Sequence, residues 1–251
     1  MTNHPFIVGH RGARNLWAEN SMSGFRNLLD LSVDAVEFDV HLSSSGELLI
    51  IHDATLDRTT ERSGRVADLG AGEYRSVILK DTNECIPTLD EVLALYASTD
   101  LILHVELKTD ADGRPYEGLE ARAAAEIDRF GLAKRSILTS FNADVLKTIR
   151  DVAPHIPRLS SLNHKSVEAK GLTKSVEDML AVSDILAIEK SMLREEWDLL
   201  SALVPADRLG VWVPNEEEDI AFWMQQPIKQ LTTDRPDIAV QVRERLMNAA
   251  A

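Results

Sequence analysis

Histidines and acidic residues stand at the ends of several short apolar runs in this chain. His10 and His52 each end such a run, and Glu37 and Asp39 alternate with apolar residues in another. Glu106 ends the run that follows. Burying charged groups is costly unless they are paired or bind a metal ion. The pattern therefore indicates a site for phosphate chemistry rather than a packed core.

Three carboxylates are the candidate metal ligands. Side chains alternate between the two faces of a strand, so Glu37 and Asp39 point the same way, and Glu106 and Lys108 repeat this one strand later. Carboxylates this close repel, and one of them protonates unless a cation lies between them. An oxygen-only set favours one divalent cation, Mg²⁺ or Ca²⁺, over zinc. We prefer this to an exposed edge strand, because the residues between the acids already supply an apolar face.

His10 and His52 are the candidate catalytic residues. Histidine is the side chain best suited to exchange a proton near neutral pH. Either one alone could be structural, but together they stand beside three acids and two cations. We predict general acid and base roles for the pair, without assigning which is which. The other histidines are expected to be structural or at the surface: His4, His41, His104, His155 and His164. A supporting role is left open for His104, because it shares a strand face with Glu106.

Arg11, Lys108 and Trp212 are the candidate substrate-binding residues. Arginine holds phosphate oxygens with a planar fork, whereas lysine acts as a compact charge. The alternative for both is charge balance for the three acids. Trp212 can stack on the organic part of a substrate, or it can belong to the core.

The composition limits the partners. The chain has 251 residues, of which 44% are hydrophobic, and its formal net charge is -14. Nucleic acid and stable membrane association are therefore not expected, since both favour basic surfaces. The expected partner is a small-molecule phosphodiester, and a homo-oligomer stays open. Cys85 is the single cysteine, and the sequence shows neither a secretory signal nor an apolar run long enough to cross a membrane, so a reducing cytoplasm is the expected location.

Strand-like and helix-like patterns alternate along the chain. The predicted strands are Phe6–His10, Ala35–Leu42, Leu48–His52, Leu101–Leu107, Ser136–Thr139, Ile156–Ser160, Ile185–Ile188, Arg208–Val213 and Ile228–Thr232. The predicted helices are Ser21–Leu31, Leu89–Ala97, Gly118–Arg129, Asn142–Asp151, Val176–Val182, Glu195–Leu203, Glu216–Met224 and Asp237–Met247. Thr88 and Glu91 have the spacing of a capping box.

About eight strand–helix units predict an α/β fold, a (β/α)8 TIM barrel, with an open doubly wound sheet as the alternative. We expect a single domain over residues 1–251. The irregular stretch at about 53–87 is expected to be a small inserted subdomain after the second strand, over the barrel mouth.

The motifs, taken in their order and spacing, resemble those of the glycerophosphodiester phosphodiesterase family over nearly the whole chain. They are HRG at His10–Gly12, ENS at Glu19–Ser21, D-x-x-E-x-D-V at Asp34–Val40, H-D-x-x-L-x-R-T-T at His52–Thr60, I-P-T-L-x-E at Ile86–Glu91, E-x-K at Glu106–Lys108, S-F at Ser140–Phe141 and T-D-R-P at Thr233–Pro236. Two positions depart from the family pattern. Ala18 stands in place of a proline, and Val213-Pro214 follows Trp212 in place of Thr-Val.

The resemblance implies metal-dependent hydrolysis of glycerophosphodiesters to glycerol 3-phosphate and an alcohol, in glycerol and phospholipid catabolism. It implies a divalent ion held by Glu37, Asp39 and Glu106, with catalysis by His10 and His52. Two alternatives are kept. One is a phospholipase D-like phosphodiesterase that acts on lysolipids or another phosphodiester, and the other is an inactive relative that only binds phosphodiesters.

Overall fold

Parallel strands close into a ring in the computed structural model, which describes residues 4–249. β1 pairs with β9 on one side and with β2 on the other, and these pairings close the sheet. β3 is antiparallel to β2 and lies outside the ring. The strands are β1 (Phe6–His10), β2 (Ala35–Leu42), β3 (Leu48–Ile50), β4 (Ile102–Leu107), β5 (Ser136–Ser140), β6 (Arg158–Leu162), β7 (Ile185–Glu189), β8 (Leu209–Trp212) and β9 (Gln230–Thr233). The predicted (β/α)8 TIM barrel is confirmed.

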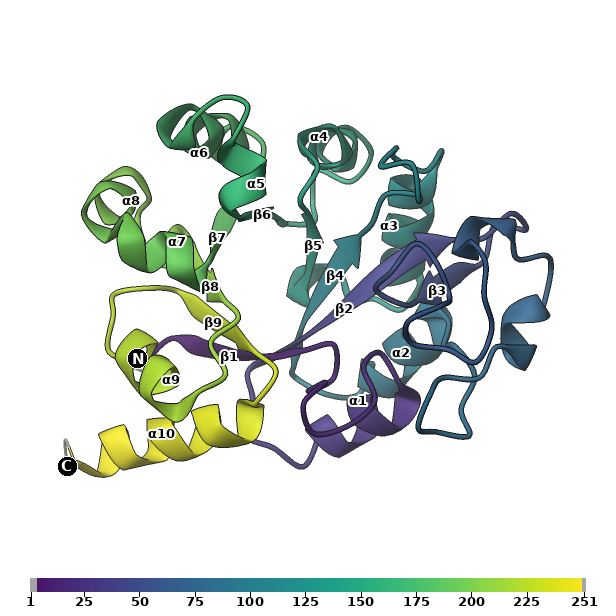
Figure 1. The fold of residues 1–251 in the computed structure, drawn as a ribbon, viewed down its shortest axis with the longest axis horizontal. Helices are drawn as coiled ribbons and strands as arrows, with labels where there is room; N and C mark the ends of the chain where they lie inside the picture. The colour runs from purple at the N-terminus through teal and green to yellow at the C-terminus, as the bar shows by residue number, and fades with distance from the viewer. Residues whose placement is uncertain (1–3, 250–251) are drawn as a thin grey trace.

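Helices surround this ring (Figure 1). They are α1 (Met22–Leu28), α2 (Leu89–Tyr96), α3 (Leu119–Arg129), α4 (Ala143–Val152), α5 (His164–Val167), α6 (Leu172–Leu180), α7 (Lys190–Glu195), α8 (Trp197–Leu203), α9 (Glu217–Trp223) and α10 (Pro236–Ala249). Within residues 4–249, no helix combines the length and apolar character needed to cross a bilayer. Residues 1–3 and 250–251, at the two ends of the predicted domain, lie outside the described part. The expectation about a secretory signal at the N-terminus falls partly on these residues.

Some element boundaries differ from the prediction. The strand expected to reach His52 ends at Ile50, and the helix expected at Glu195–Leu203 is preceded by a separate helix, α7. A short helix, α5, also precedes α6. Helix ends depend on hydrogen bonds that a periodic pattern does not encode, so such shifts are expected.

The two faces of β2 separate the hydrophobic core from the site. Phe38 faces the helices, where its ring meets Phe25 edge-on at a centroid distance of 5.8 Å. Phe25 also packs against Tyr96, whose hydroxyl donates to the Phe25 carbonyl at 2.9 Å. The alternate residues Glu37 and Asp39 therefore face the inside of the barrel, where the predicted site lies.

The segment between β3 and α2 has a small core of its own, at the place where the sequence suggested an insertion. It contains two short 3₁₀ turns, Val66–Asp68 and Glu73–Ser76. Its buried apolar residues, together with those of β3 and the following loop, form one cluster: Leu49, Ile51, Leu56, Val66, Leu69, Tyr74, Val77, Leu79 and Ile86. In Figure 1 this segment lies beside the loop that joins β1 to α1.

Helix α2 begins with the predicted capping box. The Thr88 side chain accepts a hydrogen bond from the Glu91 amide, and the Glu91 carboxylate accepts one from the Thr88 amide. These two bonds satisfy amide groups that the first turn would otherwise leave unpaired.

Replacing Thr88 by alanine should lower the free energy of unfolding by about 0.5–2 kcal/mol, the usual range for losing an N-cap. Urea denaturation followed by circular dichroism measures the change. Thr148→Ala is the matched control, because Thr148 is exposed in the middle of α4 and only bonds back to the Asp144 carbonyl. An equal loss in both variants would contradict the role of the capping box.

Candidate active site

The predicted site residues meet at the C-terminal ends of neighbouring strands. His10 on β1 is the register partner of Glu37 on β2, and Asp39 is the partner of Glu106 on β4. His52 follows β3 and joins them. All predicted site residues except Asp39 and Lys108 line one cavity of about 310 Å³ at this end of the barrel. This is the end at which TIM-barrel enzymes place their active sites.

The three predicted metal ligands converge. Glu37, Asp39 and Glu106 each offer an oxygen, and these atoms lie within 4.8 Å of one another. Glu37 and Asp39 are buried, and Glu37 Oε1 has no hydrogen-bond partner within residues 4–249. A buried carboxylate oxygen without a partner fits a hard divalent cation.

The pKa values of the two buried acids, Glu37 and Asp39, shift in opposite directions. Burial, and then the charges of Asp39 and Glu106, raise the pKa of Glu37 well above its usual value. Burial also opposes ionisation of Asp39, but Lys108 and Arg11 outweigh it and lower the pKa of that carboxyl. A cation bound among the three carboxylates would favour the ionised form of Glu37.

Arg11 and Lys108 contact the acids directly. Lys108 Nζ lies 2.6 Å from Glu106 Oε1 and 3.2 Å from Asp39 Oδ1. Arg11 Nε lies 3.3 Å from Asp39 Oδ2, and its amide donates to Glu37 Oε2 at 3.2 Å. These contacts show that Arg11 and Lys108 balance the negative charge of the three acids. Phosphate binding by the same two residues stays a prediction.

The loop after β1 holds an unusual backbone conformation. Arg11, Gly12, Ala13 and Asn20 all have positive φ angles, of 51°, 72°, 69° and 55°. A Cβ on Gly12 would lie 2.9 Å from a ring carbon of Phe25, so both the angle and the space favour glycine. The result is a tight loop that directs the Arg11 amide at Glu37 and lets Asn20 donate to Asp39 Oδ2 at 2.9 Å.

His10 is held by an acid from the other end of the chain. Its Nδ1 lies 2.5 Å from Oδ1 of Asp234, which follows β9 and is fully buried. Asn215 donates to the other oxygen of Asp234 at 2.8 Å. Burial lowers the pKa of His10, and the hydrogen bond with Asp234 partly offsets this. Because the pKa of Asp234 is lowered to about 2, its carboxylate is ionised and accepts a hydrogen bond from His10 Nδ1. The other ring nitrogen, Nε2, lies 3.7 Å from Glu37 Oε2.

His52 has an equivalent but more exposed partner. Its Nδ1 lies 2.6 Å from Oδ1 of Asp53, and Arg58 donates to both oxygens of that carboxylate. Burial lowers the pKa of His52. Arg58 also donates to both oxygens of Glu19, which ties the segment after β3 to the loop after β1.

Asp53 and Asp234 lie within the sequence motifs H-D and T-D-R-P, which was the signal for them, but no role was predicted for either residue. His41 was expected to be structural or at the surface. His41 is buried, and its Nε2 lies 3.1 Å from the His52 carbonyl while its Nδ1 lies 2.8 Å from the Tyr116 hydroxyl. This histidine therefore supports the loop that carries His52.

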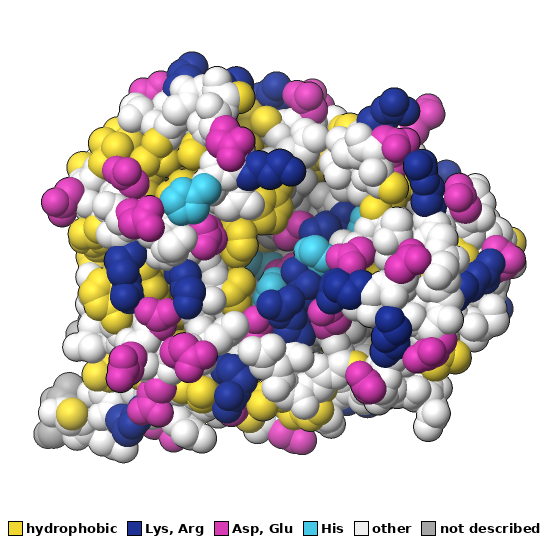
Figure 2. Space-filling model, in the orientation of Figure 1, with side chains coloured by type: hydrophobic (Ala, Val, Ile, Leu, Met, Phe, Trp, Pro, Cys, Tyr) yellow, Lys and Arg dark blue, Asp and Glu magenta, His cyan; other side chains and the backbone are white. Residues whose placement is uncertain are grey.

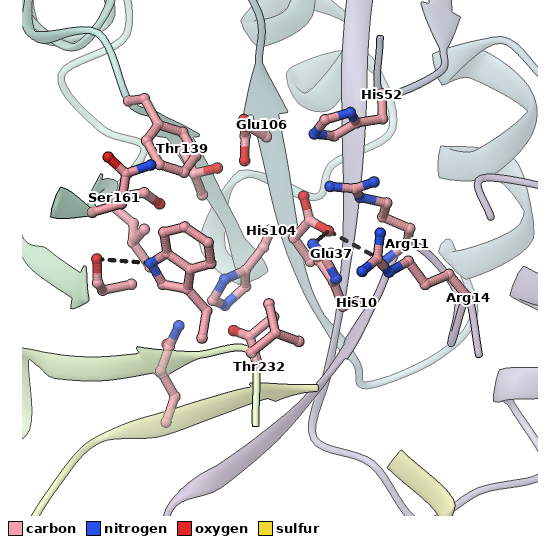
Figure 3. A pocket seen from close by; sticks show the side chains of 17 residues that line it. His10, Arg11, Arg14, Glu37, His52, His104, Glu106, Thr139, Ser161 and Thr232 are labelled. Atoms are coloured by element: carbon pink, nitrogen blue, oxygen red, sulfur yellow. Dashed lines mark hydrogen bonds and ion pairs between the residues drawn. The ribbon is translucent and has the colours of Figure 1, made fainter. Parts of the chain in front are cut away.

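Trp212 and His104 also line the cavity. Trp212 lines the cavity and its ring meets Phe141 edge-on at 5.4 Å, while its Nε1 donates to the Ala187 carbonyl at 3.2 Å. His104 is buried below the acids and also lines the cavity. Figure 3 shows Thr139 and Ser161 on one side of the cavity and Arg11, Arg14 and His52 on the other.

A family model, described as the glycerophosphoryl diester phosphodiesterase family, matches residues 10–238. The chain belongs to this family. The family is one of phosphoric diester hydrolases, so the family membership predicted from the sequence motifs is confirmed.

Individual relatives agree with the family. A glycerophosphodiester phosphodiesterase from Caldanaerobacter subterraneus subsp. tengcongensis is 33% identical over 156 residues, which are 60% of this chain and 63% of that protein. That match spans less than two thirds of the relative. A glycerophosphodiester phosphodiesterase from Bacillus altitudinis is 27% identical over 96% of this chain and 98% of its own length.

Solved structures share the fold. A protein from Agrobacterium tumefaciens superposes with a TM-score of 0.88 at 24% identity, covering 97% of this chain and 99% of the other. A phosphodiesterase from Oleispira antarctica, solved with its product sn-glycerol-3-phosphate, has a TM-score of 0.74 at 23% identity over 96% and 97% of the two chains.

Replacing Asp234 by asparagine should move the pH–rate limb of His10 to lower pH, because the carboxylate raises the pKa of that imidazole. The rate at neutral pH should fall roughly 10- to 100-fold, within the range for disturbed acid/base catalysis. Phosphodiester hydrolysis between pH 4 and 9 measures both effects.

The control for this experiment is Asp237→Asn, which removes a nearby carboxylate that pairs with Arg235. It should leave the pH profile unchanged. A profile of Asp234→Asn that coincides with that of the wild type would contradict the positioning of His10 by Asp234.

Proposed function

We propose that this protein hydrolyses glycerophosphodiesters to glycerol 3-phosphate and an alcohol, in glycerol and phospholipid catabolism. The observation that carries the proposal is the convergence of three carboxylates in a cavity that also holds two imidazoles. Family membership supports it, as does the product complex of the Oleispira antarctica phosphodiesterase. The single cysteine, Cys85, supports a reducing cytoplasm as the location.

Glu37, Asp39 and Glu106 would hold one divalent cation, and both Mg²⁺ and Ca²⁺ accept such an oxygen set. When bound, the cation supplies Lewis-acid stabilisation of the negative charge that builds on the phosphoryl oxygens. The convergence of the three carboxylates and the unpaired oxygen Glu37 Oε1 support this assignment.

Arg11 and Lys108 would bind the same phosphoryl group. Both lie beside the carboxylate cluster, and burial around them strengthens their interaction with an anion. Their contacts with Asp39 hold them in place before the substrate arrives, so little reorganisation is needed when charge develops. Trp212 and Phe141 would contact the organic part of the substrate from the opposite wall.

His10 and His52 would transfer the protons. One imidazole removes a proton from the attacking oxygen, of water or of a glycerol hydroxyl, as that oxygen bonds to phosphorus. The other donates a proton to the leaving alkoxide as its bond to phosphorus breaks. Attack by water gives glycerol 3-phosphate directly, whereas attack by the glycerol hydroxyl gives a cyclic phosphate, which a water then opens as one ring P–O bond breaks and its oxygen takes up a proton. Asp234 and Asp53 fix Nδ1 of each ring as the donor to a carboxylate, which leaves both Nε2 atoms for this chemistry.

A phospholipase D-like activity on lysolipids is the competing proposal. The same cluster of acids and histidines would serve it, and the two activities differ in the substrate. A direct test compares glycerol 3-phosphate release from glycerophosphocholine with choline release from lysophosphatidylcholine. Turnover of the lysolipid alone would replace the first proposal by the second.

Adding Mg²⁺ or Ca²⁺ to protein stripped with EDTA should restore hydrolysis and raise the melting temperature, because a ligand that binds only the folded state stabilises it. At a hundredfold excess over the dissociation constant the stabilisation is about 2.7 kcal/mol. Differential scanning fluorimetry measures the shift. Asp39→Asn should lose it, and the surface variant Glu177→Gln should keep it. Full activity in EDTA would refute the metal site.

Replacing His10 or His52 by alanine should lower the turnover rate by roughly two to four orders of magnitude, the range for losing a general acid or base. His155→Ala is the control, because His155 is exposed and, among the described residues, pairs only with Asp128. Release of glycerol 3-phosphate measures the rate. Near-normal turnover in both active-site variants would show that the imidazoles do not carry the proton transfer.

A further inference from the structure

A second hollow adjoins the active-site cavity. It has a volume of about 610 Å³ and lies between the loop after β1 and the segment after β3. We call it the entrance groove, and its residues are Arg14–Glu19, Ser23, Arg58, Thr59 and Leu79–Thr82. Arg14 lines both the groove and the active-site cavity, so the two spaces meet at this side chain.

The two sides of the active-site cavity differ in charge. The wall formed by β5–β8, away from Arg14, carries aromatic, aliphatic, hydroxyl and amide side chains and no charged one among the described residues that line the cavity there: Thr139, Phe141, Leu159, Ser161, Asn163, Ala187, Trp212 and Val213. Figure 2 shows hydrophobic side chains along one edge of the hollow and a group of Lys and Arg side chains along the other. A phosphodiester bound between them has one substituent on each side.

Arg14 is available to a ligand in a way that Arg11 is not. Within residues 4–249 Arg14 makes one ion pair, between its Nε and Oδ1 of Asp234 at 2.8 Å, and about a third of its side chain is exposed. That contact fixes the guanidinium and leaves its two terminal nitrogens for an anion. Arg11, in contrast, is largely buried and pairs with both Asp39 and Glu19.

The groove also has a small excess of basic side chains, Arg14, Arg58 and Lys80 against Glu19 and Asp81, on a strongly acidic protein. Lys80 Nζ donates to the carbonyls of Asp57 and Arg58 and makes no ion pair with a carboxylate in the described part of the chain. Of the two acids in the groove, Glu19 is neutralised by bonds from Arg58, and Asp81 remains.

The groove also holds a polar atom without a partner. The hydroxyl of Thr59 lies in the groove wall, is buried and has no partner within residues 4–249. Because this oxygen is shielded from solvent, a ligand in the groove does not contact it while the surrounding side chains keep their positions.

We propose that the entrance groove binds the alcohol part of the substrate, and that Arg14 selects an alcohol that carries a negative charge. This inference rests on the proposed function and adds a substrate class to it. The neutral wall receives the glycerol part, whose hydroxyls match its hydroxyl and amide groups. The anionic alcohol lies along the groove, with its charged group against the terminal nitrogens of Arg14 and near Lys80. Such charge-assisted hydrogen bonds are the strongest of their kind.

The test compares two substrates that differ in this charge. Glycerophosphoglycerol has a neutral alcohol, and bis(glycerophospho)glycerol carries a second phosphate on it. The wild type should show a kcat/KM about tenfold higher for the anionic compound, as expected for one additional charge-assisted bond, and 0.5 M salt should reduce the preference. Arg14→Gln should bring the ratio of the two kcat/KM values close to one.

Two further variants separate charge from positioning. Arg14→Lys should keep most of the preference, because the charge remains, while the turnover of both substrates falls with the loss of the contact to Asp234. Arg26→Gln removes the same charge from the exposed face of α1, outside both cavities, and should leave the preference unchanged. An equal loss of both substrates in Arg14→Gln, or a wild type without preference, would overturn the inference.

A binding measurement makes this inference independent of turnover. In the slow variant His52→Ala with Mg²⁺, calorimetry should show tighter binding of the anionic compound, and adding Arg14→Gln should abolish the difference. Equal dissociation constants in His52→Ala would overturn the selection by Arg14. Selective binding combined with no hydrolysis by the wild type would instead count against the proposed function alone.

Discussion

Repulsion between carboxylates is the constraint on which the active-site end of this barrel depends. Glu37 and Asp39 lie on one face of one strand, are buried, and share that space with Glu106. Left alone, such a cluster would take up protons or expand. Lys108 and Arg11 keep Asp39 ionised by pairing with it from two directions. The site is thus assembled from charges that are each unfavourable when buried alone and stable only as a group.

The loops follow from this requirement. A guanidinium reaches Asp39 from the loop after β1 only because that loop turns sharply through residues with positive φ, among them Gly12. Asn20 then satisfies the second oxygen of Asp39. Arg58 extends the pairing outward by joining Glu19 to Asp53, the partner of His52. Charge compensation therefore runs continuously from the buried acids to the surface, and it couples the histidine after β3 to the loop after β1.

Sequence patterns predicted the barrel and the central residues because both depend on local order. Alternation along β2 places Glu37 and Asp39 on one face whatever their neighbours are, and parallel strands in a closed ring bring their C-terminal ends together. The closure itself required the pairing of β1 with β2 and β9, which no local pattern encodes. The partner of His10 was also out of reach, since Asp234 lies 224 positions from it. Likewise, Arg14 looked like an ordinary loop residue until the groove beside it was visible.

The contact between His10 and Asp234 joins the first strand of the ring to the turn after the last one. During translation, the first imidazole leaves the ribosome long before the aspartate that orients it. A partly synthesised chain therefore carries most of the acids and both histidines, yet it lacks the oriented His10. Competence for hydrolysis arises only when β9 closes the ring, so the same event that completes the fold also switches on the chemistry.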